Sequence, residues 1–300
     1  MDAFISHASE QVATAKRLRR ALERNGLHVW MDDAKIRAGI LLRDQLSAAI
    51  QEAKAFVLLW SKAAARSRWV SAELLTAFHV DRPIIPCSFD TAPLPQFMSN
   101  LLRVDVPGKN RQWTSSVTRA VREAPPRAFV PIVMTSQEPR LKDVANALAE
   151  AQQIVLAGFA RRDLATAQEA QDTVGRMLAP ARRRWRYDAQ LLNIAGYHSK
   201  NAYMLKHWEQ IQAGFTPADA LLNRAEKQFF QSLFVDPNDF SALNGLASVL
   251  ILEHELRAAA FFNGRAIQLA EMAGVDYDAA KRDRTLIEYY LQRSERPTRS

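Results

Sequence analysis

Residues 55–60 read Ala-Phe-Val-Leu-Leu-Trp, six apolar side chains without a polar interruption. A strand covered by helices on both faces of a sheet has this continuous pattern. Upstream, Leu18 and Leu22 mark one face of a helical stretch that ends at Asn25 and Gly26. The run at 55–60 therefore predicts the central strand of a parallel sheet whose strands are separated by helices.

Further segments continue this alternation of strands and helices over the first 122 residues. We expect the other strands at 3–5, 27–30, 84–87 and 101–104, and helices at 12–22, 44–53, 69–80 and 113–122. Strands separated by helices predict an α/β fold, a doubly wound parallel sheet of five strands. Ligands of such sheets bind beyond the carboxyl ends of the strands.

Pro125 and Pro126 interrupt this pattern, because neither proline can continue a helix. Beyond them the sequence is mostly helical, although 129–133 fits either a short strand or an extended connector. The predicted organisation is a first domain at 1–124, a linker at 125–139, a helical domain at 140–292 and a tail at 293–300.

The helical part contains a weak internal repeat. Small, aromatic, small and proline positions of a tetratricopeptide (TPR) helix are matched by Ala225, Phe229, Ser232 and Pro237. The register continues for one period of about 34 residues, but Asn263 and Glu271 depart from it. We therefore expect an all-α, TPR-like helical repeat, with an unrelated helical bundle as the alternative. The segment 216–219, Thr-Pro-Ala-Asp, predicts a helix start with Pro217 at the first helical position.

Composition limits the remaining classes of protein. A membrane-spanning helix needs about 20 apolar residues, and the apolar runs here are shorter. We also see no secretion signal. The single cysteine, Cys87, excludes an internal disulfide and is expected in the core, which fits a cytoplasmic protein. The scattered histidines predict no metal site.

The net charge of +8 raises the question of a nucleic-acid partner. Basic residues are densest at 182–186, Arg-Arg-Arg-Trp-Arg. This stretch fits a solvated helix face or an anion-contacting patch, and no nucleic-acid-binding motif accompanies it. We therefore expect no nucleic-acid partner, although a basic chain also suits a polyanionic small ligand such as a dinucleotide.

Four segments of the first domain, in order, resemble the TIR (Toll/interleukin-1 receptor) family, which has a flavodoxin-like fold. They correspond to the opening strand and loop, the second strand, the loop that the family calls BB, and the central strand with the helix that follows. In this sequence they are DAFISHA (2–8), GLHVWMD (26–32), IRAGILL (36–42), and LLWS (58–61) running into SRWVSAE (67–73).

The residues also predict a polar site without reference to the family. Trp69 and Glu73 are four positions apart, so on a helix they share one face. Ser6 and Ser61 follow the first and central strands at their carboxyl ends. Sheet topology should bring these hydroxyls close to the helix of Glu73, as in a ligand-binding cleft.

The family resemblance implies a reaction. Within the family, Trp-x-x-x-Glu is typical of members that cleave NAD+, and here it implies Glu73 as the catalytic carboxylate. NAD+ would be the substrate, and no further cofactor is expected. The products would be nicotinamide and either ADP-ribose or a cyclic isomer. Expected substrate-binding residues are Phe4, Ser6, His7, Asp32, Arg37, Gly39, Leu41, Ser61, Lys62 and Trp69.

The resemblance also implies partners. TIR domains often self-associate through the BB loop, where Leu41 and Leu42 are apolar. The helical domain is expected to promote or restrain this contact, in response to a protein trigger, in bacterial antiphage defence. One alternative is a non-catalytic TIR module that signals through TIR–TIR and TPR-like contacts. Another is a deoxyribosyltransferase of similar fold, which the BB segment argues against.

Overall fold

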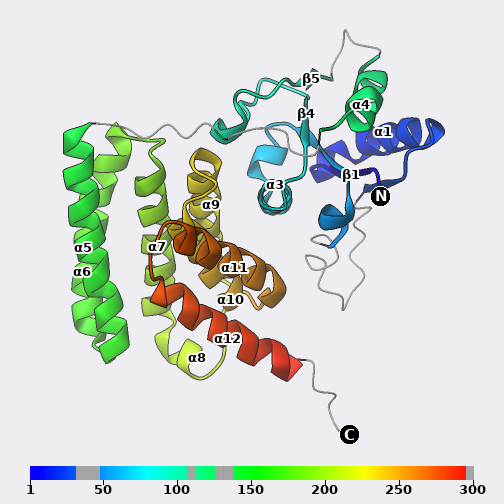
Figure 1. Cartoon of the computed structure of the whole chain (residues 1–300). Coiled ribbons are helices and arrows are strands. Elements are labelled where there is room, and N and C mark those ends of the chain that lie inside the picture. Colours follow the sequence, from blue (N-terminus) through cyan, green and yellow to red (C-terminus); the bar gives the residue numbers. More distant parts are fainter. Residues whose placement is uncertain (32–47, 107–111, 126–130, 132–137, 295–300) are drawn as a thin grey trace, which may run out of the picture. The chain divides into compact units, whose positions relative to one another are not determined.

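The computed structural model describes residues 1–31, 48–106, 112–125, 131 and 138–294. The chain divides into two compact units, Met1–Ile132 and Val133–Ser300, and Figure 1 colours them from blue to green and from green to red. No helix in the described ranges has the length and apolar character needed to cross a bilayer.

The first unit contains a parallel sheet of five strands, as the sequence predicted. Its order is β2-β1-β3-β4-β5, and every neighbouring pair is parallel. The fully buried β3 lies at the centre. The strands are β1 (Ala3–Ser6), β2 (Val29–Met31), β3 (Ala55–Trp60), β4 (Ile84–Ser88) and β5 (Val104–Asp105).

Helices pack against the sheet on both faces. On one face, Ile5 and Val57 belong to a core shared with α1 (Val12–Arg24) and α4 (Trp113–Arg122). Side chains alternate between the faces along a strand, so Phe4 and Ser6 point the other way. There α3 (Arg68–His79) packs against β1. This second face carries the predicted site.

Two strands begin two or more residues later than the sequence-based expectation. The last strand is Val104–Asp105 rather than 101–104, and β2 begins at Val29 rather than at Leu27. Leu102 is 97% exposed, so the apolar run before β5 is not a buried strand. The amide of Leu101 instead closes a turn onto the carbonyl of Met98.

The second unit is an array of antiparallel helix pairs followed by one further helix. Within each pair the helices pack along their lengths, and the second helix of one pair also contacts the first helix of the next (Figure 1). The pairs are α5 (Pro139–Arg161) with α6 (Leu164–Arg184), α7 (Ala189–Lys206) with α9 (Ala220–Val235), and α10 (Phe240–Leu252) with α11 (Leu256–Met272). The short α8 (Trp208–Gln212) follows α7, and α12 (Asp278–Ser294) follows α11.

A single aromatic ring joins two of these pairs. Phe229 of α9 is fully buried against Gly196 of α7 and Gly245 of α10. A Cβ atom would lie 2.6 Å from that ring at Gly196 and 2.2 Å from it at Gly245, so neither position has room for a side chain. The repeat positions Ala225 and Ser232 are buried on the same helix. The helical second unit is confirmed, and this stacking supports its interpretation as a TPR-like repeat.

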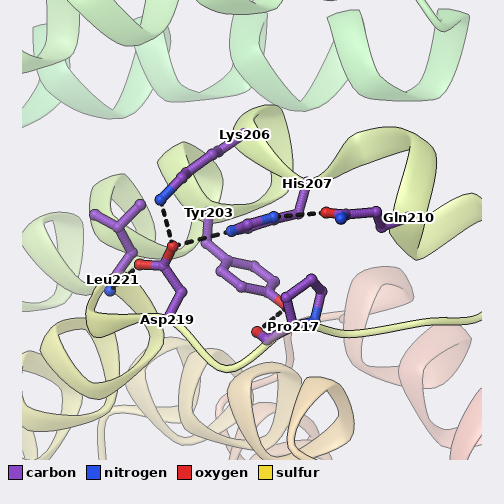
Figure 2. Close-up of polar contacts among 7 residues, drawn as sticks. All are labelled: Tyr203, Lys206, His207, Gln210, Pro217, Asp219 and Leu221. Carbon is purple, nitrogen blue, oxygen red and sulfur yellow. Dashed lines mark hydrogen bonds and ion pairs between the residues drawn. The ribbon is translucent and has the colours of Figure 1, made fainter.

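The start of α9 corrects the prediction for 216–219. The helix begins at Ala220, and Asp219 rather than Thr216 caps it, accepting a hydrogen bond from the Leu221 amide. Pro217 lies before the helix, where its carbonyl accepts from the Tyr203 hydroxyl at 2.9 Å (Figure 2). The Thr216 hydroxyl is engaged elsewhere, 2.9 Å from Nε2 of His254.

Candidate functional site

A buried contact between a hydroxyl and a carboxylate forms the centre of the candidate site. Ser6 Oγ, at the end of β1, donates a hydrogen bond of 2.5 Å to Oε2 of Glu73 in α3. Ser6 is 1% exposed and Glu73 is 6% exposed. Ser67 starts α3 by accepting a hydrogen bond from the Val70 amide. This cap fixes where the helix begins, and hence which of its residues face the end of β1.

The contact lies where the order of strands reverses. β1 and β3 are neighbours in the sheet although β2 lies between them in sequence, so their carboxyl ends form the switch point of the fold. Ser6 ends β1, and Ser61 directly follows β3. Open α/β sheets bind ligands at such a point. The prediction that Ser6, Ser61 and Glu73 share one end of the sheet agrees with this placement.

Ser61 also has a structural role. Its buried hydroxyl accepts from the amide of Ala64, the first residue of a short 3-10 helix, Ala64–Arg66, at 3.1 Å. The neighbouring Lys62 has an exposed side chain, and its amide donates to Oδ2 of Asp90 at 2.9 Å. Ser61 and Lys62 are thus held at the carboxyl end of β3 by these hydrogen bonds.

Trp69 and Glu73 lie on the same side of α3 with different exposure. Trp69 is 37% exposed, one helical turn from the buried carboxylate. His7, the residue after β1, is partly buried. An accessible indole beside a buried acid can stack on an aromatic ring whose attached sugar reaches the carboxylate.

Phe4 lies in the interior of the sheet. Its side chain is fully buried, and its ring stacks between Trp30, at a centroid distance of 4.9 Å, and Phe56, at 5.5 Å. Phe4 and Ser6 point to the same face of the sheet because they are two positions apart in β1. The aromatic stack therefore forms the floor beneath Ser6.

Two polar residues at the carboxyl end of β4 were not among the predicted site residues. Asp90 accepts from the amides of Lys62 and Ala92, and these backbone hydrogen bonds keep its pKa below the usual value. Ser88 ends β4 in register with Trp60. Its buried Oγ makes no hydrogen bond to the described residues. Ser88 directly follows the apolar run 84–87, and this is the sequence signal that identifies it, whereas Asp90 lies two residues further on.

Other predicted residues are placed differently or lie outside the described part. Cys87 is buried in the sheet, as predicted, and burial raises the pKa of its thiol far above the usual value. An inert core thiol is the result. Four predicted binding residues, Asp32, Arg37, Gly39 and Leu41, lie outside the described residues, and their roles remain predictions.

Comparison with known proteins gives one family match, in the first unit. Residues 3–121 match the family model described as "TIR domain". Over 93 residues the chain is 29% identical to a protein of Methanobrevibacter olleyae named "Probable 2' cyclic ADP-D-ribose synthase TcpO". The similarity covers 30% of this chain and 27% of that protein. The chain therefore spans about a quarter of the length of the relative it matches. No solved structure gives a match.

Proposed function

We propose that this chain, whose residues 3–121 form a TIR domain, cleaves the bond between nicotinamide and ribose in NAD+. The observation that carries the proposal is the buried Glu73 carboxylate, which accepts a 2.5 Å hydrogen bond from Ser6 at the switch point of the sheet. The name of the relative, a probable 2' cyclic ADP-D-ribose synthase, supports the same class of substrate.

The chemistry needs few groups. The N-glycosidic bond breaks with its electron pair going to the pyridinium nitrogen, so nicotinamide leaves as a neutral molecule. The ribose that remains has oxocarbenium character, and an adjacent carboxylate stabilises that positive charge. Glu73 supplies the carboxylate in this proposal. Ser6 is a positioning residue, because its hydrogen bond fixes one carboxylate oxygen.

Substrate binding is assigned to the groups around this acid. Trp69 offers a partly exposed indole for stacking, and Lys62 provides a cation for the pyrophosphate at the carboxyl end of β3. Phe4 contributes indirectly, because its ring is part of the aromatic stack beneath Ser6. His7 and Ser61 complete the proposed set at the strand ends, together with Asp32, Arg37, Gly39 and Leu41.

The acceptor determines the product. Attack on the ribose by water, with loss of a proton, gives ADP-ribose. Attack by a hydroxyl or ring nitrogen of the same ADP-ribose gives a cyclic isomer, again with loss of a proton from an attacking hydroxyl. The name of the relative favours cyclisation in that protein. We extend this preference to the present chain and add activation by self-assembly, with a role in antiphage defence.

The test compares the purified full chain with Glu73→Gln, which keeps the shape of the side chain and removes its charge. We expect the wild type to release nicotinamide from NAD+ and the variant to be at least about a hundredfold slower. Glu23→Gln is the matched control, because Glu23 is exposed and pairs with Arg19 on α1.

Mass spectrometry of the remaining nucleotide separates ADP-ribose from a cyclic isomer, which is lighter by one water molecule. If the wild type released no nicotinamide even when assembled, the enzyme proposal would be wrong and the non-catalytic TIR module would take its place. Equal rates for the wild type and Glu73→Gln would instead remove Glu73 from the mechanism.

A further inference from the structure

The last helix of the array has an uncovered apolar face. α12 packs on α11 through its buried residues Ala280 and Ile287. On another face, Leu286, Tyr289 and Tyr290 are 40%, 50% and 39% exposed. Within the described residues, α12 is followed by no second helix of the kind that pairs with α7 and α10. Exposed apolar side chains grouped on one helix face are typical of an interaction surface.

Charges are ordered along the same face. At 100° per residue, the exposed residues of this face lie within about 120° of one another around the helix axis. Asp278 stands near the amino end and Arg293 at the carboxyl end, and Arg282 and the apolar residues lie between them. We call this set the α12 stripe: Asp278, Arg282, Leu286, Tyr289, Tyr290 and Arg293.

We propose that the α12 stripe binds the α12 stripe of a second copy of this chain, with the two helices antiparallel about a two-fold axis near Leu286. Asp278 lies eight residues before Leu286 and Arg293 lies seven after it, about 12 Å and about 10.5 Å along the axis. Reversing one helix therefore brings each Asp278 level with the partner's Arg293. A two-fold contact needs this kind of self-complementary surface.

The aromatic residues fit the same arrangement. Arg282 lies four residues before the centre and Tyr290 four residues after it, so the guanidinium of one copy meets the ring of the other as a cation–π pair. Arg293 is already held on the stripe, because its Nη1 donates to the Tyr289 hydroxyl at 2.6 Å. A parallel pair would instead place like charges together at both ends, which is unfavourable.

The pairing goes beyond the proposed NAD+ chemistry and does not depend on it. It concerns residues of the second unit only, and the measured quantity is molecular mass rather than turnover. Glu73→Gln should therefore keep the wild-type association constant while it loses nicotinamide release. Failure of one proposal leaves the other intact.

The experiment is sedimentation equilibrium of the full chain over a concentration series. We expect a monomer–dimer equilibrium for the wild type. Asp278→Arg and Arg293→Asp should each weaken the dimer about tenfold, because each variant faces like charges at two symmetric contacts. An equimolar mixture of the two variants should recover the wild-type constant. In the mixed dimer one helix has a base at both ends and the other has an acid at both ends, so each end contact again joins opposite charges.

Glu288→Arg is the matched control. It has the same change in charge as Asp278→Arg but lies away from the stripe, where Glu288 pairs with Arg284, so the dimer should persist. Circular dichroism verifies that every variant keeps its helices. A monomeric wild type at all concentrations, single variants that dimerise normally, or a mixture that stays weak would each overturn the proposal.

Discussion

Two carboxylates of this chain meet different kinds of partner. In the helical unit, Asp219 accepts from the Lys206 ammonium at 2.6 Å and lies 2.9 Å from Nε2 of His207 (Figure 2). In the TIR domain, Glu73 meets the neutral hydroxyl of Ser6, 67 positions away. Lys206 and His207, which are close to Asp219 in sequence, hold this turn together, and their hydrogen bonds lower the pKa of Asp219. The Ser6 hydroxyl, brought across the fold, fixes the position of one oxygen of the Glu73 carboxylate.

Of the substitutions that test this difference between Glu73 and Asp219, Ser6→Ala should have the largest effect, and the effect should be on the rate of nicotinamide release. Removing the hydroxyl deletes the hydrogen bond that positions one oxygen of the buried Glu73 carboxylate, so the rate of nicotinamide release should fall about tenfold. Asp219→Asn should leave that rate unchanged, since Asp219 belongs to the second unit. Turnover at saturating NAD+ is the measurement.

Ser71→Ala is the matched control for Ser6→Ala. Ser71 is also buried, and its hydroxyl donates to the Ser67 carbonyl within α3 rather than to Glu73. We expect the Ser71 variant to keep wild-type turnover. If both serine variants lost activity equally, the Ser6 contact would have no specific role.

The candidate site shows which features could be predicted from the sequence and which could not. The convergence of Ser6, Ser61 and Glu73 at one end of the sheet followed from topology, because all parallel strands end at the same edge. Their hydrogen-bond pattern did not follow, since it depends on how α3 packs against β1. Only the folded chain shows that Ser6 reaches Glu73, whereas the Ser61 hydroxyl accepts from the Ala64 amide.

The two sequence-based predictions that were wrong, at 216–219 and 101–104, have a related physical cause. Thr216 and Pro217 have the local features of a helix start, but His254, 38 positions away, engages the Thr216 hydroxyl. Asp219 then caps α9. Leu102 has an apolar side chain but lies in solvent, so its apolar run forms no strand. In each case a tertiary environment decides between local options of similar strength.

A smaller effect is expected from Asp219→Asn, and it should appear in stability. Hydrogen bonds from His207 and Lys206 hold the pKa of Asp219 well below its usual value of 3.8. A lowered pKa stabilises the fold above pH 3.8, and this contribution is lost as the pH falls below that value. We expect the variant to melt about 2 to 4 °C lower at pH 7, with the difference closing below pH 3.8.

Thermal unfolding monitored by circular dichroism measures this difference between pH 7 and pH 3. Lys206→Met gives an independent check, because it removes the ammonium group that donates to Asp219 and keeps Asp219 as the helix cap. We expect a smaller loss with the same pH dependence. A deficit for Asp219→Asn that stayed constant through this pH range would show that the cap, and not the ionised state, stabilises the turn.

The smallest effect has the opposite sign and comes from Asp239→Asn. Asp239 caps α10 by accepting from the Ser241 and Ala242 amides, and burial raises its pKa from 3.8 to about 6. The folded state therefore binds the proton more tightly, and the wild type loses stability as the pH rises from 3.8 to about 6. Asparagine caps a helix about as well as aspartate and has no charge to bury.

The Asp239→Asn substitution should thus raise the melting temperature by about 1 to 2 °C at pH 8, with the advantage disappearing near pH 4. Melting curves at pH 4, 6 and 8 measure it beside Asp219→Asn. The same substitution at two helix caps then has opposite effects, because Asp219 accepts hydrogen bonds from Lys206 and His207, whereas Asp239 is partly buried and lies near Asp236. Destabilisation of Asp239→Asn at pH 8 would mean that the two amide hydrogen bonds outweigh the cost of burying the charge.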